Sequence, residues 1–253
     1  MSKVRIFALG GLDEDGKNML VVEVDEKIFV IEAGLKYPDS ETLGVEFIIP
    51  DFSYLIQNKD RVKAIFITHA HDDVVAALPY LLKQINVPVY TGAMTALIIR
   101  ETLKKEGIRN VKVHRIKRSD TMRIDGVRIQ TFPMTHAFPD TFGVAISTDQ
   151  GYVVYTGEFI IDYDMMQEEY CCDLNLLSEF GKKGVGGAAV RIPGRGAQRA
   201  YLAQSSDHES HRADHREPSG RAYPDLYLFS VAVPHPRDPG CGDQIPQEDL
   251  HPR

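Results

Sequence analysis

Three short segments of the chain carry side chains that bind divalent metal ions in proteins. The first, residues 68–73, reads Thr-His-Ala-His-Asp-Asp and places two histidines two residues apart, followed by acids. A third histidine, His136, and an acid, Glu158, lie in two later segments. Neutral imidazole nitrogens and carboxylates are ligands for zinc, or for manganese where oxygen ligands dominate. These residue types therefore predict a metal site.

Each of these segments follows an apolar run that predicts a β-strand. Val62–Thr68 is nearly all apolar, as in a strand buried on both faces. His136 follows the run Val127–Phe132, and Glu158 follows Tyr152–Tyr155. Residues that directly follow the strands of a sheet are held by rigid elements, and their side chains can converge on one site. A histidine pair alone is weak support for a metal, but the shared strand-end position favours a metal site over scattered surface histidines.

The periodicity of residues 1–183 predicts an α/β layered sandwich. Two helices are expected, Val74–Ile85 and the amphipathic segment Ala93–Lys105. Pro79 must lie in or near the first turn of the helix Val74–Ile85, or else it kinks that helix. The predicted strands are Val4–Leu9, Met19–Val24, Ile28–Glu32, Val62–Thr68, Val89–Thr91, Val111–Ile116, Val127–Phe132, Gly143–Ser147 and Tyr152–Tyr155.

The composition limits the class of protein. Of the 253 residues, 43% are apolar and 26% charged, which is typical of a globular protein, and no stretch approaches the ~20 apolar residues of a membrane span. Cys171, Cys172 and Cys241 form neither a disulfide framework nor a CxxC motif, so we expect a cytoplasmic protein. A net charge of −7 argues against a generally basic, nucleic-acid-coating surface. It leaves RNA open as a partner, because a local groove with divalent metal can hold phosphate.

The segment around the histidine pair, THAHDDVVAALPYLL, resembles the HxHxDH signature of the metallo-β-lactamase superfamily. Within it, the flanking blocks resemble the ribonuclease J family, among them FALGGLDEDGKNML, LGVEFIIPDFSYL, THAFPDTFGVAI and VVYTGEFIID. The match covers nearly all of residues 3–183. It implies a four-layer αβ/βα sandwich with metals between the sheets. It also implies exo- and endonucleolytic hydrolysis of RNA in mRNA decay and rRNA processing.

The resemblance also implies a ligand set, carried over by position. His69, His71 and His136 would hold the first metal ion, zinc or manganese. Asp73 would bind a second ion, and Glu158 would bridge the two. His71 and Asp73 are the candidate catalytic residues.

Three departures from the family pattern predict an eroded second metal site. Val74 stands in place of a ligating histidine, while Glu158 and Glu32 each replace an aspartate by a side chain one methylene longer. This resembles the less active second paralogue of Gram-positive bacteria. Two hypotheses follow: a weakly active ribonuclease, or a non-catalytic partner subunit of an active paralogue in a homo- or hetero-oligomer. A thioesterase or lactamase-like hydrolase is the third alternative, and the flanking blocks disfavour it.

The composition changes after Lys183. All thirteen lysines lie at or before this residue, whereas eight of the fourteen prolines follow it, in a segment without helical or strand periodicity. We therefore expect 1–183 to be the N-terminal part of the metallo-β-lactamase domain. Residues 184–253 would be a disordered extension or a segment read out of frame, since a shifted frame can supply the family's next blocks in order. The family's β-CASP insert and C-terminal region would then be absent.

Overall fold

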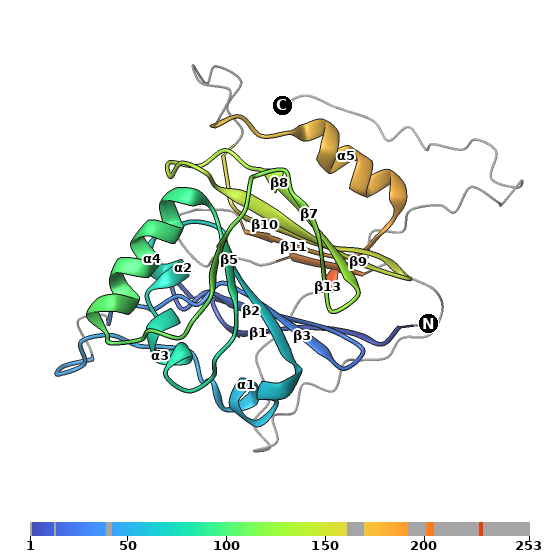
Figure 1. Ribbon diagram of the computed structural model, residues 1–253. Coiled ribbons are helices and arrows are strands. Elements are labelled where there is room, and N and C mark those ends of the chain that lie inside the picture. Colours follow the sequence, from blue (N-terminus) through green and yellow to red (C-terminus); the bar gives the residue numbers. More distant parts are fainter. Residues whose placement is uncertain are drawn as a thin grey trace, which may run out of the picture.

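Two β-sheets pack face to face, and helices cover the outer face of each (Figure 1). The structure, a computed structural model, describes residues 2–12, 14–38, 42–160, 170–191, 201–204 and 228–229. The predicted α/β four-layer sandwich is confirmed.

The first sheet runs in the order β1-β2-β3-β4-β5-β6. The first three strands are antiparallel and the last four, from β3 onward, are parallel. Parallel strands end at the same edge of a sheet, so the segments that follow β3, β4, β5 and β6 lie along one edge. The strands are β1 (Val4–Gly10), β2 (Met19–Val24), β3 (Lys27–Ile31), β4 (Val62–Ile67), β5 (Val89–Thr91) and β6 (Val113–Arg115).

The second sheet begins as an antiparallel meander of four strands. These are β7 (Thr121–Ile124), β8 (Val127–Pro133), β9 (Phe142–Thr148) and β10 (Gly151–Glu158). Beyond β10 the sheet continues with β11 (Val185–Arg191), β12 (Tyr201–Gln204) and β13 (Leu228–Phe229). Strand β11 pairs parallel to β10, and β12 pairs antiparallel to β11.

Strand β11 lies beyond Lys183, where the sequence shows no strand periodicity. Four of its seven residues are glycine or alanine, so backbone pairing defines the strand without an alternation of apolar side chains. Most of 184–253 lies outside the described residues. The interpretation of this segment as disordered or out of frame therefore stays a prediction.

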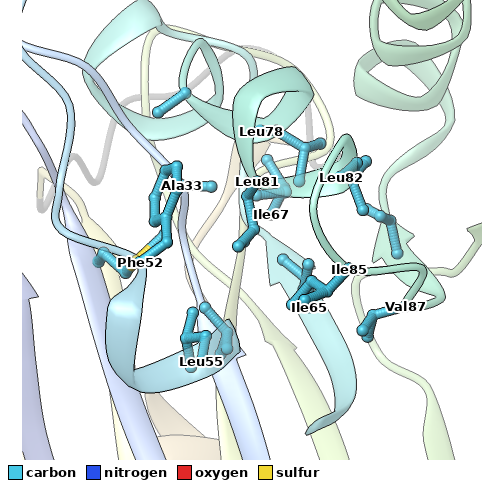
Figure 2. Packing of buried hydrophobic residues seen from close by; sticks show 14 of the residues in the cluster. Ala33, Phe52, Leu55, Ile65, Ile67, Leu78, Leu81, Leu82, Ile85 and Val87 are labelled. Carbon is cyan, nitrogen blue, oxygen red and sulfur yellow. The ribbon is translucent and has the colours of Figure 1, made fainter. Parts of the chain in front are cut away.

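Three apolar clusters separate the layers, and the alternation of side chains along the strands creates them. One face of β4, with Ile65 and Ile67, packs against Leu78, Leu81 and Leu82 of the helical layer (Figure 2). The other face of the first sheet packs against the second sheet in a cluster that includes Phe66 and Val144. The outer face of the second sheet packs against Phe180.

In the described part of the chain, four helices lie on the first sheet and one on the second. They are α1 (Ser53–Gln57), α2 (Asp72–Val75), α3 (Leu78–Leu82), α4 (Ala93–Lys105) and α5 (Leu174–Lys183), and a 3₁₀ turn, η1, spans Lys59–Arg61. Helix α4 has the predicted bounds. Among the described helices, none combines the length and hydropathy needed to cross a membrane.

The single helix predicted over Val74–Ile85 is wrong, because the structure has two short helices, α2 and α3, in its place. The backbone groups that would continue α2 are bonded elsewhere. The Val74 carbonyl accepts from the Ala33 amide at 2.7 Å, and the Ala77 amide donates to the Ala33 carbonyl at 2.8 Å. Pro79, which has no amide proton, lies in the first turn of α3. The loop after β3 thus interrupts the helix through its contacts with Val74 and Ala77. Local periodicity in the sequence cannot reveal such contacts.

Candidate metal centre

The first two histidines lie where the chain leaves β4. Buried strand β4 ends at Ile67, and His69, completely buried, follows it. His71 has an extended backbone and caps α2, its carbonyl accepting from the amides of Val74 and Val75 at 3.0 Å each. The first turn of α2 therefore fixes the backbone of His71.

Two more of the five predicted ligands come from the second sheet. His136 lies in the loop that follows β8, and Glu158 is the last residue of β10. The amide of Ile160 donates to the carbonyl of Thr135 at 2.9 Å and so joins these two segments. Both ligands are only 9% exposed. The ligands thus converge from both sheets at one end of the sandwich.

The side chains of His69, His71, His136 and Glu158 each offer one donor atom, and these atoms all lie within 4.8 Å of one another. Nδ1 of His71 lies 3.1 Å from Nε2 of His69 and 3.3 Å from Nε2 of His136. Oε2 of Glu158 lies 3.8 Å from Nε2 of His136. In a tetrahedral zinc site, metal–nitrogen bonds of about 2.0 Å separate neighbouring donors by about 3.3 Å. The donor set and its spacing fit one such ion.

The environment of His136 favours its neutral form, which is the form that binds metal. Burial, and then the neighbouring His71, hold the pKa of His136 below its ordinary value, against a smaller opposing effect of Asp73. A neutral imidazole has a lone pair to give to a metal, whereas the imidazolium has none.

Hydrogen bonds behind His69 select which of its nitrogens faces the cluster. The Thr68 hydroxyl donates to Oε1 of the buried Glu32 at 2.6 Å, so it accepts from Nδ1 of His69 at 2.9 Å. Nδ1 therefore carries the proton and leaves the Nε2 lone pair toward the other donors. The role of Thr68 was not predicted from the sequence. Its place between a buried strand and the first histidine was the available signal.

Asp73 does not join the four clustered donors. It lies in the first turn of α2, and its Oδ2 accepts from the side-chain amide of Asn18 at 2.8 Å, a partner that was not predicted from the sequence. Val74, 2% exposed, packs in the first apolar cluster. Four of the five predicted ligands are thus brought together, and a second-metal role for Asp73 stays a prediction.

The comparisons with known proteins agree with this architecture. Residues 45–177 match the Beta-lactamase superfamily domain. Over 183 residues the chain is 41% identical to ribonuclease J 2 of Staphylococcus aureus and 42% identical to that of Staphylococcus epidermidis, in both cases over 72% of this chain and 33% of the relative. The chain therefore spans about a third of the length of these relatives.

Among solved structures, a protein of unknown function from Enterococcus faecalis has a similar fold. Its TM-score is 0.50 at 15% identity, over 63% of this chain and 44% of that chain, which bears on the fold alone. The match to the superfamily domain covers more than half of the chain. All four residues of the donor cluster lie within it. The chain belongs to the metallo-β-lactamase superfamily and, within it, to the ribonuclease J family.

Proposed function

We propose that this chain is the N-terminal part of a metal-dependent ribonuclease of the ribonuclease J type, which hydrolyses RNA phosphodiester bonds in mRNA decay and rRNA processing. The observation that carries the proposal is that three histidine nitrogens and the Glu158 carboxylate lie close together at one end of the sandwich. The name of the relatives, ribonuclease J 2, supports RNA as the substrate class. Such a role implies a cytoplasmic protein.

The donor set favours zinc, with manganese as the alternative, because three of the four donors are imidazoles. A bound ion of this kind supplies Lewis-acid polarisation and an activated water. His69, His71, His136 and Glu158 would hold the ion. Thr68, with Glu32, fixes the tautomer of His69.

We further propose that activity is weak, because only one site has a full set of donors. A second ion would have Asp73 and a share of Glu158, with no donor from Val74. Two-metal hydrolysis uses one ion at the attacking oxygen and one at the leaving oxygen. Low occupancy of the second position would therefore limit turnover.

The alternative is a non-catalytic partner subunit of an active ribonuclease J paralogue. One observation favours it besides Val74: helix α4 exposes Met94, Leu97 and Ile98, which are 46%, 54% and 37% exposed. Apolar side chains at this spacing form a stripe that a second subunit could cover. Copurification with an active paralogue would support this alternative.

The domain boundary near Lys183 is part of the proposal. A shift of reading frame near codon 185 would explain the loss of lysine and the gain of proline after that point. The nucleotide sequence of codons 180–190 tests this interpretation.

The metal assignment is tested with His69→Ala in the purified 253-residue chain. We expect the wild type to bind about one equivalent of zinc or manganese, and His69→Ala to lose it, because a buried donor of the cluster is removed. His114→Ala is the control, since His114 is an exposed β6 residue that stacks on Tyr90. Equal metal content in the wild type and His69→Ala would overturn the assignment.

A further inference from the structure

Arg118 lies in the turn between β6 and β7, and the backbone of this turn is tied to β8. The hydroxyl of Thr131 donates to the carbonyl of Lys117 at 2.9 Å and accepts from the amide of Asp120 at 2.8 Å. The amide of Thr131 donates to the carbonyl of Asp120 at 2.9 Å. Within the turn, the amide of Lys117 donates to the Asp120 carboxylate at 2.7 Å. Arg118 is therefore carried by a turn with a fixed position on the second sheet.

The half-buried guanidinium of Arg118 reaches three backbone carbonyls. Nε donates to Thr141 at 3.0 Å, and Nη2 donates to Met134 at 2.9 Å and to Cys171 at 3.0 Å. Met134 and Thr141 are the two ends of the loop that carries His136. A single side chain thus holds both ends of a ligand loop and joins them to the segment that precedes α5.

The loop has few bonds of its own to hold this shape. The amide of Met134 donates to the carbonyl of Thr141 at 3.3 Å, which is long, and the hydroxyl of Thr141 donates to the carbonyl of Phe138 at 2.7 Å. The bonds from Arg118 are charge-assisted, and such bonds are about twice as strong as neutral ones. The guanidinium therefore adds charge-assisted bonds at both loop ends, just beyond the last pair of the β8/β9 ladder, Pro133 with Phe142.

We propose that Arg118 is a positioning residue for the metal ligand His136: it closes the ligand loop and so holds Nε2 of His136 at its place among the donors. The inference rests on the proposed metal site. A metal site tolerates a donor displacement of only about 0.5 Å, so a loop closed less firmly binds the ion less tightly. Lysine cannot replace the arginine, because an ammonium on a flexible stem does not present the planar fork that reaches Thr141 and Met134 together.

The test compares Co²⁺ and Zn²⁺ affinity, by competition with a chromophoric chelator, in the 253-residue wild type, Arg118→Lys and Arg118→Gln. We expect the dissociation constant to rise about tenfold or more in both variants, the usual effect of removing a group that orients a metal ligand. The visible absorption of bound Co²⁺, which reports ligand geometry, should change as well. Arg128→Lys, an exposed cation on β8, is the matched control and should leave both readouts unchanged. If Arg118→Gln does not fold, Arg118→Lys, which keeps the charge, carries the test.

A double-mutant cycle with His136→Ala separates positioning from general stability. If Arg118 acts through His136, Arg118→Lys should change the residual affinity of the His136→Ala protein by less than twofold. An equal loss of affinity in both backgrounds would overturn the proposal, as would wild-type affinity in Arg118→Lys. A wild-type protein that binds neither ion would instead contradict the proposed metal site itself.

Discussion

At the scale of single residues, the proposal of a one-metal centre depends on Val74. Its side chain packs in the first apolar cluster and has no donor atom, while the neighbouring Asp73 carboxylate accepts from Asn18. The four clustered donors are spaced so that they could hold one ion. The predicted second-site ligand Asp73 is thus already in a hydrogen bond with Asn18, which adds to the cost of binding metal there.

The substitution Val74→His should add a second metal equivalent to the purified chain. The imidazole would supply the missing donor next to Asp73, at a stability cost of about 1–3 kcal/mol for placing a polar ring in an apolar cluster. Metal analysis together with denaturant unfolding measures both effects. Val75→His is the control, since Val75 is a buried neighbour in the same helix and should lose stability without gaining metal. Wild-type metal content in Val74→His would show that the second site lacks more than this one ligand.

The clustered donors could be predicted from sequence because histidines and acids at strand ends are visible as residue types. The roles of Thr68 and Asn18 could not. Asn18 contacts Asp73 across 55 positions of sequence. The tautomer of His69 depends on Glu32, which directly follows the neighbouring strand β3. Such roles follow from distances between elements, which no local pattern encodes.

At the scale of elements, the loop after β3 positions α2 through a very close backbone approach. A Cβ added at Gly34 would lie 1.6 Å from the carbonyl oxygen of Asp73. In the same contact, the amide of Leu35 donates to the carbonyl of Asp72 at 3.0 Å. The start of α2, which follows the predicted ligand His71, therefore depends on a residue without a side chain.

We expect Gly34→Ala to weaken metal binding at least tenfold and to destabilise the chain by about 1–3 kcal/mol, since the methyl group must push α2 away from β3. Gly181→Ala is the matched control. Gly181 lies inside α5, and no atom beyond its own helix lies within 4 Å of an added Cβ, so alanine should leave metal binding unchanged and stabilise the helix slightly. Chelator competition and thermal unfolding of the two variants make the comparison. Wild-type affinity in Gly34→Ala would show that the approach is not needed.

Most strands were predictable, because apolar runs and alternation follow the faces that the three clusters bury. Strand β7 was missed, since this short edge strand, Thr121–Ile124, is only partly buried. Helix α5 was missed as well. Its one local signal was Asp173, whose carboxylate accepts from the Leu176 amide as an N-cap, while Gly181 lowers its helix propensity.

At the scale of the whole molecule, the charge is unevenly distributed along the chain. The net charge is −7, yet residues 100–128 contain ten lysines and arginines against four acids. This segment includes edge strand β6, whose last residue, Arg115, is exposed and lies at the sheet edge where the parallel strands end. The metal ligands that follow β4 lie along the same edge. An acidic chain can thus present positive charge beside its metal centre.

The last prediction follows from this asymmetry and concerns RNA binding. Arg115→Glu should weaken the affinity for single-stranded RNA about tenfold at moderate salt and reduce the slope of log affinity against log salt by about one, as expected when one phosphate contact is lost.

Lys59→Glu is the control, because it changes the net charge by the same amount. Lys59 lies on η1, before β4 begins, and so at the opposite end of that strand from the metal ligands. If the contact is local, Lys59→Glu should leave the salt slope unchanged, and both variants should keep their metal. Fluorescence anisotropy with a short labelled RNA at three or more salt concentrations measures both quantities. Equal losses in the two variants would mean that net charge, and not a basic surface beside the metal centre, governs the encounter with RNA.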